Sequence, residues 1–258
     1  MSNPTEHTLA VPTLASFGGE LSVAVIGASG GLGSAFTAAL ERAPAVVRVF
    51  TFSRAAMTPL SAKTAWQWID LENEESIAGA AAMAKGAAGS LHLVIVATGL
   101  LHDSEQQPEK SWRSLTAATL QRAFAVNATG PALVAKHFLP LLAKDRKTVF
   151  AALSTRVGSV EDNRLGGWHA YRASKAALNM LIRTLAVELA RRNDRALCIG
   201  LHPGTVDTAL SRPFQAGLPE GKLFTPARAA GQLLEVLDGL SPGHSGGFFA
   251  WDGQRLPF

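Results

Sequence analysis

The chain has 258 residues, of which 47% are hydrophobic and 17% charged, with a net charge of +4. This length and apolar content suffice for one large α/β domain or two small ones. The basic residues are scattered and do not alternate with aromatic side chains, so we expect no nucleic-acid partner. The single cysteine, Cys198, excludes an intrachain disulfide and a zinc ribbon. Its apolar neighbours predict a buried structural thiol.

The first 19 residues are polar and contain Pro4 and Pro12. They lack the basic start and the apolar stretch of a signal peptide. No apolar run in the chain is long enough to cross a bilayer. We therefore expect a cytoplasmic protein with no membrane partner, in which residues 1–20 form an extension and residues 21–258 a single dinucleotide-binding and catalytic domain.

Strand and helix patterns alternate along this domain. Short apolar runs rich in Val and Ile predict buried strands over residues 21–26, 46–52, 66–69, 91–97, 148–153, 196–201 and 247–251. Helical patterns cover residues 34–42, 75–85, 116–144 (interrupted near Gly130-Pro131 and Pro140), 170–191 and 226–240. Residues 205–224 have no clear period, so we expect a mobile substrate-binding loop there. The alternation predicts an α/β fold: a single doubly wound parallel sheet, Rossmann-like, with helices on both faces.

Tyr171 and Lys175 are four residues apart in the helix predicted over residues 170–191, so their side chains leave the same face one turn apart. An ammonium group beside a phenol favours the phenolate and lowers the tyrosine pKa from about 10 toward neutral pH. Such a phenol would serve as a general acid. A Tyr and a Lys one turn apart are also common on helix surfaces, so the pair by itself does not establish a site.

A glycine-rich turn, Gly27-Ala28-Ser29-Gly30-Gly31-Leu32-Gly33, follows the first predicted strand and precedes a helix. Backbone N–H groups and a helix N-terminus at such a turn can bind a pyrophosphate. The same letters match G-x-S-x-G, with Ser29 as the nucleophile of an α/β-hydrolase. We favour the nucleotide interpretation, because the turn follows the first strand and no HGGG-type segment precedes it.

The end of the second predicted strand reads Phe52-Ser53-Arg54 and carries no acid. An NAD site places an acid near this point to hold the ribose hydroxyls. An arginine can instead bind a 2′-phosphate with two hydrogen bonds. We therefore expect NADP(H) in preference to NAD(H).

Several short motifs, in this order along the chain, resemble the short-chain dehydrogenase/reductase family. They are Gly27-x-x-x-Gly31-x-Gly33, Asp70-Leu71, Ala97-Thr98-Gly99, Asn127, Ser154-Thr155, Tyr171-x-x-x-Lys175 and the run from His202 to Thr208. Residues 127–131, 156–159, 166–172 and 248–258 are similar to the branch that contains C-factor and the Sniffer-like carbonyl reductases. The resemblance implies a Rossmann-like fold and carbonyl reduction with a nicotinamide cofactor.

The resemblance also implies residue roles. Tyr171 would be the acid/base, Lys175 would hold the nicotinamide ribose, and Asn127 would support a water-linked proton path. A hydroxyl after the fifth strand would orient the substrate carbonyl, Asp70 would contact the adenine amino group, and Thr205 or Thr208 would lie near the phosphates. The full set of expected cofactor-binding residues is Gly27, Ser29, Gly31, Leu32, Gly33, Ser53, Arg54, Asp70, Leu71, Ala97, Thr98, Gly99, Lys175, Pro203, Gly204, Val206 and Thr208.

Three positions depart from the family pattern. Ile26 stands where Thr usually precedes the first glycine, and Ala97-Thr98-Gly99 stands where Asn-Ala-Gly is usual. The catalytic serine of the family precedes a glycine by three residues, and counting back from Gly158 gives Thr155, with Ser154 one residue before. Thr offers the same donor and acceptor as Ser, although β-branching stiffens its rotamer. The choice between Ser154 and Thr155 stays open.

The leading hypothesis is an oxidoreductase that transfers a hydride between NADP(H) and a small carbonyl or secondary alcohol substrate, with Tyr171 as acid/base. The alternative is a nucleotide-binding signalling or regulatory protein of the same fold without turnover. The seven histidines show no metal-ligand spacing, so we expect no metal. Apolar faces on helices 116–144 and 170–191 suggest a homodimer or homotetramer, as the family implies.

Overall fold

The computed structural model describes residues 11–59 and 61–258, and its centre is a seven-stranded sheet. The strands are β1 (Leu21–Ile26), β2 (Val46–Ser53), β3 (Thr64–Trp68), β4 (Leu93–Val96), β5 (Thr148–Leu153), β6 (Ala196–His202) and β9 (Phe248–Ala250). They lie in the order β3-β2-β1-β4-β5-β6-β9, and every neighbouring pair is parallel. The strand order reverses between β1 and β4, and ligands of such sheets bind outside the strand ends at this point.

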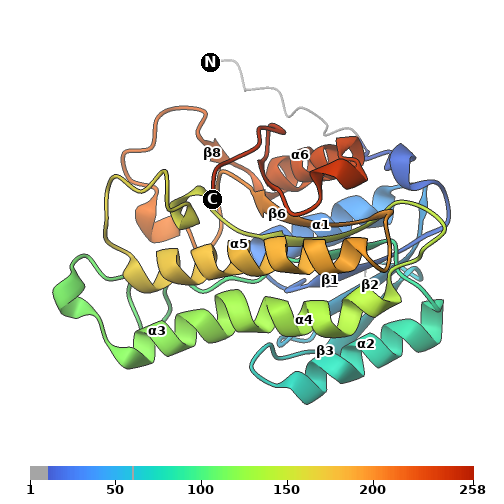
Figure 1. Ribbon diagram of the computed structural model, residues 1–258, viewed down its shortest axis with the longest axis horizontal. Coiled ribbons are helices and arrows are strands. Elements are labelled where there is room, and N and C mark those ends of the chain that lie inside the picture. Colours follow the sequence, from blue (N-terminus) through green and yellow to red (C-terminus); the bar gives the residue numbers. More distant parts are fainter. Residues whose placement is uncertain (1–10, 60) are drawn as a thin grey trace.

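Helices cover both faces of the sheet. On one face α1 (Gly31–Arg42) and α6 (Pro226–Gly239) bury Phe36, Leu40 and Leu233 against β1 and its neighbours. On the other face α2 (Glu74–Ala88), α4 (Gly130–Phe138) and α5 (His169–Ala190) form a second core that includes Phe138 and Ile182 (Figure 1). The prediction of one doubly wound parallel sheet is therefore confirmed.

The helix predicted over residues 116–144 is divided in the structure. It consists of α3 (Ala117–Phe124), a π-helical turn (Ala125–Thr129), α4 and a 3₁₀ turn (Leu139–Leu141). Pro131 has no N–H to donate to the carbonyl of Asn127, four residues earlier, so regular α-helical bonding cannot continue through this point. The interruption expected at Gly130-Pro131 therefore appears as a widened turn just before it, and Asn127 lies in that turn.

Residues 205–224 contain a short parallel ladder that the sequence did not predict. It pairs β7 (Thr205–Val206) with β8 (Leu223–Phe224). Strands of two residues are too short to show a period of two in the sequence. The ladder closes the ends of the loop, so only residues 207–222 project beyond it. The other predicted boundaries differ slightly; β4, for example, starts at Leu93 because Leu91 forms only an isolated bridge with Leu142.

The predicted N-terminal extension falls outside the described residues as far as residue 10. From Val11 onward the chain lies against the domain, with a 3₁₀ turn (Ala15–Phe17) whose Phe17 is buried in the core shared with α1 and α6. Leu14 is buried in the same core. Within the described part of the chain, no helix is long and apolar enough to span a membrane.

Candidate active site

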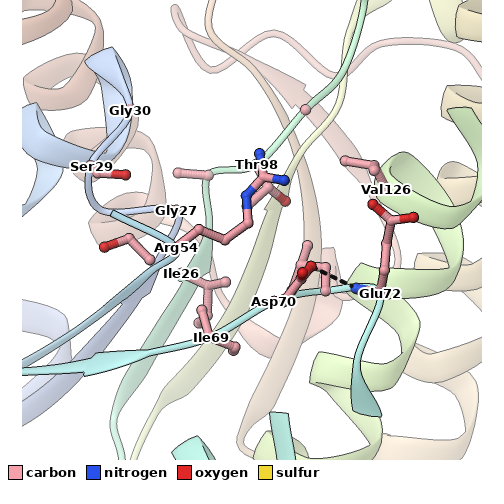
Figure 2. A pocket seen from close by; sticks show the side chains of 14 residues that line it. Ile26, Gly27, Ser29, Gly30, Arg54, Ile69, Asp70, Glu72, Thr98 and Val126 are labelled. Atoms are coloured by element: carbon pink, nitrogen blue, oxygen red, sulfur yellow. Dashed lines mark hydrogen bonds between the residues drawn. The ribbon is translucent and has the colours of Figure 1, made fainter. Parts of the chain in front are cut away.

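Two cavities lie at the carboxyl ends of the strands, one where the strand order reverses between β1 and β4 and one beside the ends of β5 and β6. The glycine-turn cavity, of about 230 Å³, lies beside the ends of β1, β2 and β4. It is lined by Ile26, Gly27, Ser29, Gly30, Ser53, Arg54, Ile69, Asp70, Leu71, Glu72, Ala97, Thr98, Gly99 and Val126 (Figure 2). The structure thus brings together nine of the predicted cofactor residues from four separate strand ends. Five lining residues were not among the predicted cofactor residues: Ile26 and Gly30, which lie at or in the glycine turn, and Ile69, Glu72 and Val126, which belong to no recognised motif.

Three glycines of this turn lie so close to neighbouring side-chain or backbone atoms that a Cβ would collide with them. Gly27 has φ +84°, and a Cβ there would lie 2.8 Å from Thr98 Cγ2. A Cβ on Gly33 would lie 2.0 Å from the Gly27 carbonyl oxygen, and one on Gly31 would lie 2.6 Å from Thr208 Cγ2. The N-cap of α1 is Gly30, which supplies no side-chain cap, so the N–H groups of the first helical turn remain available to a ligand.

The polar residues of this cavity fit a phosphorylated adenine nucleotide. Arg54 is exposed and enters the cavity from the end of β2, and Figure 2 shows it between the glycine turn and the Asp70 segment. Thr98 Oγ1 is buried and has no hydrogen-bond partner within the described residues. Ser53 directs its hydroxyl inward, donating to the Ala55 carbonyl (2.6 Å) and accepting from Trp66 Nε1 (2.9 Å). Because that hydroxyl is already engaged, Arg54 is the side chain at this strand end that can reach a ligand.

The hydrolase alternative built on Ser29 finds no support here. Ser29 lines the glycine-turn cavity, but none of the described histidines does. A serine nucleophile needs an adjacent base, most often histidine. Among the described residues, no group of three or more His, Cys, Asp or Glu side chains is arranged to hold a metal ion.

The second cavity, the Tyr171 cavity, has a volume of about 440 Å³ and is bordered on one side by residues 205–218. It is lined by Leu32, Leu101, Ser154, Thr155, Arg156, Val157, Trp168, Tyr171, His202, Pro203, Gly204, Thr205, Val206, Thr208, Leu210, Ser211, Phe214 and Leu218. The predicted residues Ser154, Thr155, Tyr171, Pro203, Gly204, Val206 and Thr208 therefore come together around one space. The apolar and aromatic wall was not foreseen, because it is assembled from loops without a repeating pattern.

Tyr171 and Lys175 lie in the first turns of α5 and both are buried. Lys175 Nζ donates a hydrogen bond to the Leu153 carbonyl oxygen (2.8 Å) and lies 6.0 Å from the centre of the Tyr171 ring. Burial raises the pKa of the Tyr171 phenol and lowers the pKa of Lys175 to about 7. The expected lowering of the Tyr171 pKa is therefore wrong for the protein alone. Desolvation of the phenolate is the larger effect, and the buried ammonium is itself disfavoured.

Ser154 and Thr155 end β5 and face different surroundings. Ser154 is buried and donates its hydroxyl hydrogen to Asn179 Oδ1 (2.7 Å). Thr155 is only partly buried, and its hydroxyl forms no hydrogen bond with the described residues. Both residues line the Tyr171 cavity, but only the Thr155 hydroxyl is uncommitted.

Asn127 joins three segments beneath Gly99. Its Oδ1 accepts from Leu100 N (2.7 Å), and its Nδ2 donates to the Leu100 carbonyl (2.8 Å) and to Ser174 Oγ (3.0 Å). The Asn127 side chain is fully buried. It therefore fixes the strand end after β4 relative to α5, the helix that carries Tyr171 and Lys175.

Glu109 contacts the start of α5 and was missed by sequence reasoning. It is 4% exposed, and its Oε2 accepts from Ala170 N (3.2 Å), while its backbone oxygen accepts from Trp168 N (2.6 Å). The N-cap residue of α5 is Trp168, whose indole cannot accept a hydrogen bond, so Glu109 takes the place of a capping side chain. Glu109 lies in a loop without helical or strand periodicity, so the sequence does not predict its contact with α5.

Comparison with known proteins agrees with this geometry. A model of the short chain dehydrogenase family matches residues 22–218. C-signal of Myxococcus xanthus is 39% identical over 141 residues, which are 55% of this chain and 80% of that protein.

Two solved structures share the fold. The carbonyl reductase Sniffer of D. melanogaster superposes with a TM-score of 0.81 at 24% identity, covering 93% of this chain and 100% of that one. An NADPH-bound carbonyl reductase from chicken fatty liver gives 0.80 at 26% identity, with the same coverage. The match over residues 22–218, with this strand order and these motifs in sequence, shows that the chain belongs to the short-chain dehydrogenase family of oxidoreductases.

Proposed function

We propose that the protein is an NADPH-dependent carbonyl reductase. The observation that carries this proposal is the Tyr171 cavity, in which the phenol of Tyr171 and the uncommitted hydroxyl of Thr155 line one space with the Pro203-Gly204 turn. A small aldehyde or ketone fits such a volume. The similarity to a carbonyl reductase solved with NADPH supports the same chemistry.

Two residues of the chain would have separate roles in this reaction. Tyr171 donates its proton to the carbonyl oxygen, and Thr155 donates a hydrogen bond to the same oxygen. When bound, NADPH supplies the hydride that the carbonyl carbon receives. The Tyr171 phenol is protonated at neutral pH and can donate, whereas alcohol oxidation needs the phenolate, which burial disfavours by raising the Tyr171 pKa.

The glycine-turn cavity would hold the cofactor. The glycine turn and the N-terminus of α1 would bind the pyrophosphate, and Arg54 the 2′-phosphate. Asp70 would contact the adenine and Lys175 the nicotinamide ribose. No acid stands beside Arg54 at the end of β2, which supports NADP(H) over NAD(H).

The first test is NADPH oxidation, followed spectrophotometrically, against a panel of aldehydes, ketones and quinones. We expect the wild type to reduce at least one class, and Tyr171→Phe to bind NADPH normally while losing reduction almost completely. The phenyl ring preserves packing and removes only the proton donor. A Tyr171→Phe enzyme with a near-normal rate would assign the proton to another group.

A second candidate is a nucleotide-binding regulatory protein of the same fold, and the similarity to C-signal, a protein named for signalling, favours it. The two functions differ in their need for a proton donor. If the wild type binds NADPH tightly but oxidises none against the panel, the regulatory function would be preferred.

We also propose that the protein acts in the cytoplasm as a homodimer or homotetramer. The outer face of α5 presents Met180 and Val187, which are 67% and 45% exposed. Large apolar side chains exposed on one helix face suit packing against a second copy. Size-exclusion chromatography with light scattering would measure the assembly.

A further inference from the structure

The wall of the Tyr171 cavity is apolar and aromatic. Trp168 and Phe214 lie with their ring centres 4.8 Å apart, and Phe214 also packs edge-on against His102 at 5.5 Å. Leu101, Leu210 and Leu218 complete this side. Such a wall accommodates the flat apolar body of a ligand.

Arg156 brings a positive charge into the same cavity. It directly follows Thr155 and is the only side chain with a formal charge among the described residues that line the cavity. No Asp or Glu of the described chain lines it. An anionic ligand would therefore meet one cation and no carboxylate in the lining, whereas a cationic ligand would be repelled.

The Arg156 guanidinium forms few interactions with the described residues. Its one ion pair among the described residues is a long contact from Nε to Asp162 Oδ2 (3.4 Å), and the two side chains are 51% and 39% exposed. Exposed pairs of this kind contribute little to stability. Both terminal NH₂ groups of Arg156 lack a hydrogen-bond partner among the described residues, and these groups form the fork that binds a carboxylate.

His202 also lines this cavity and supplies a second polar side chain. Its Nδ1 is buried and has no hydrogen-bond partner within the described chain. Burial and, to a smaller extent, the Arg156 charge lower the His202 pKa to about 4, while the Asp252 carboxylate opposes them. The imidazole is therefore neutral at physiological pH, so the positive charge in the cavity comes from Arg156 alone.

We propose that the substrate is an aromatic or similarly flat apolar carbonyl compound that carries an acidic group, and that Arg156 binds this group. The inference rests on the proposed reductase function and extends it to a substrate class. The wall formed by Trp168 and Phe214 holds the apolar body, while Arg156 selects the charge. Arg156 and Thr155 both line this cavity, so one ligand can present its acidic group to Arg156 and its carbonyl to Thr155.

The test compares two aldehydes of nearly equal shape, 4-carboxybenzaldehyde and 4-methylbenzaldehyde, as substrates with NADPH. We expect the wild type to favour the carboxylate through a lower KM. Arg156→Met should lower kcat/KM for 4-carboxybenzaldehyde ~10- to 100-fold more than for 4-methylbenzaldehyde, the ratio expected for losing one charge-assisted contact. Arg156→Lys should restore part of the preference, since it keeps the charge without the fork.

Asp162→Asn is the matched control, because it breaks the same ion pair from the other side and does not line the cavity. It should keep or increase the preference for the carboxylate. If Asp162→Asn loses the preference as Arg156→Met does, the pair is structural and the proposal fails. Equal effects of Arg156→Met on both aldehydes would also overturn it, with the reductase function left intact.

A binding experiment separates this inference from the reductase function. Calorimetric titration of the complex with NADP⁺ should show benzoate binding more tightly than benzamide, and Arg156→Met should remove the difference. Benzoate selectivity without NADPH oxidation would preserve the acid site and reject the reductase. The absence of any benzoate preference in the wild type would reject the acid site.

Discussion

Tyr171 and Lys175 are neighbours on α5, and burial acts on their protonation in opposite directions. It raises the pKa of the phenol and lowers that of the amine to about 7, because each charged form loses its hydration. Lys175 compensates in part by donating to the Leu153 carbonyl. Burial therefore disfavours the charged form of both groups, and the Tyr171 phenol is protonated at neutral pH, as the proposed proton donor must be.

Arg54 is the residue on which cofactor choice should depend. We predict that Arg54→Asp weakens NADPH binding by ~1.5–3 kcal/mol, the range for hydrogen bonds to charged groups. NADH binding should weaken far less, because NADH has no 2′-phosphate. Fluorescence titration with both cofactors measures this. Arg48→Asp, on the same strand but outside the cavity, controls for the change in net charge. Equal losses for both cofactors would contradict the assignment.

Thr155 and Ser154 offer a direct comparison of two adjacent hydroxyls. Thr155→Ala should lower kcat ~10²- to 10³-fold, as removal of one donor to the substrate oxygen typically does. Ser154→Ala should leave kcat within a few-fold and lower stability instead, because it removes the buried hydrogen bond to Asn179. Thr155→Ser should retain activity. The opposite order of rates would transfer the role to Ser154.

At the scale of elements, the start of α5 depends on the loop that follows β4. The loop reaches α5 at two places: Asn127 holds Leu100 beside Ser174, and Glu109 accepts from Ala170 N. The second contact lies one residue before Tyr171. The orientation of the Tyr171 side chain therefore depends partly on a segment some 60 residues earlier in the chain.

Glu109 should act as a positioning residue for Tyr171. We predict that Glu109→Leu, which leaves Ala170 N–H without its acceptor, lowers kcat ~10-fold or more while NADPH affinity is unchanged. Glu109→Gln keeps an acceptor oxygen and should recover most of the rate. Amide hydrogen exchange should show faster exchange at Ala170 in the Leu variant only. Unchanged kcat in a folded Glu109→Leu protein, with faster exchange at Ala170, would limit Glu109 to stability.

At the scale of the whole molecule, Asp238 near the end of α6 binds the N-terminal segment of the described chain. Its carboxylate accepts from Ala15 N (3.1 Å) and from Ser16 N (2.8 Å), so the N-terminal segment is held against the end of α6. Partial burial alone would raise the Asp238 pKa, but the hydrogen bonds from Ser16 and Ala15 lower it overall. The folded protein therefore favours the charged carboxylate more than the unfolded chain does.

Asp238→Ala should lower the free energy of unfolding by ~1 kcal/mol, the usual cost of losing a capping carboxylate, and the Tm by ~2–4 °C. Because the folded-state pKa is depressed, the contribution is present at neutral pH and is lost as pH falls through the acid range. Wild type and variant should therefore converge in Tm toward pH 3. Thermal melts from pH 3 to 8 measure this. A difference in Tm that does not change with pH would contradict it.

Local pattern in the sequence determined the strands of the central sheet, the glycine turn, the doubly wound class and the helix that carries Tyr171 and Lys175. These features depend on neighbours within one or two turns, or on backbone geometry that only glycine allows. The family pattern carried along the chain was sufficient to name most residues that line the two cavities.

Only the tertiary structure decided how those residues are used. The pKa of Tyr171 depends on burial by distant segments, so spacing to Lys175 could not give its direction. The proposal of Thr155 over Ser154 rests on Asn179, which accepts a hydrogen bond from the Ser154 hydroxyl and not from the Thr155 hydroxyl. The roles of Glu109 and Arg156 come from loops without a period, whose contacts form only when the sheet brings them together. Local periodicity predicts elements because it reflects nearest neighbours, whereas the chemistry of this site depends on contacts between residues far apart in the chain.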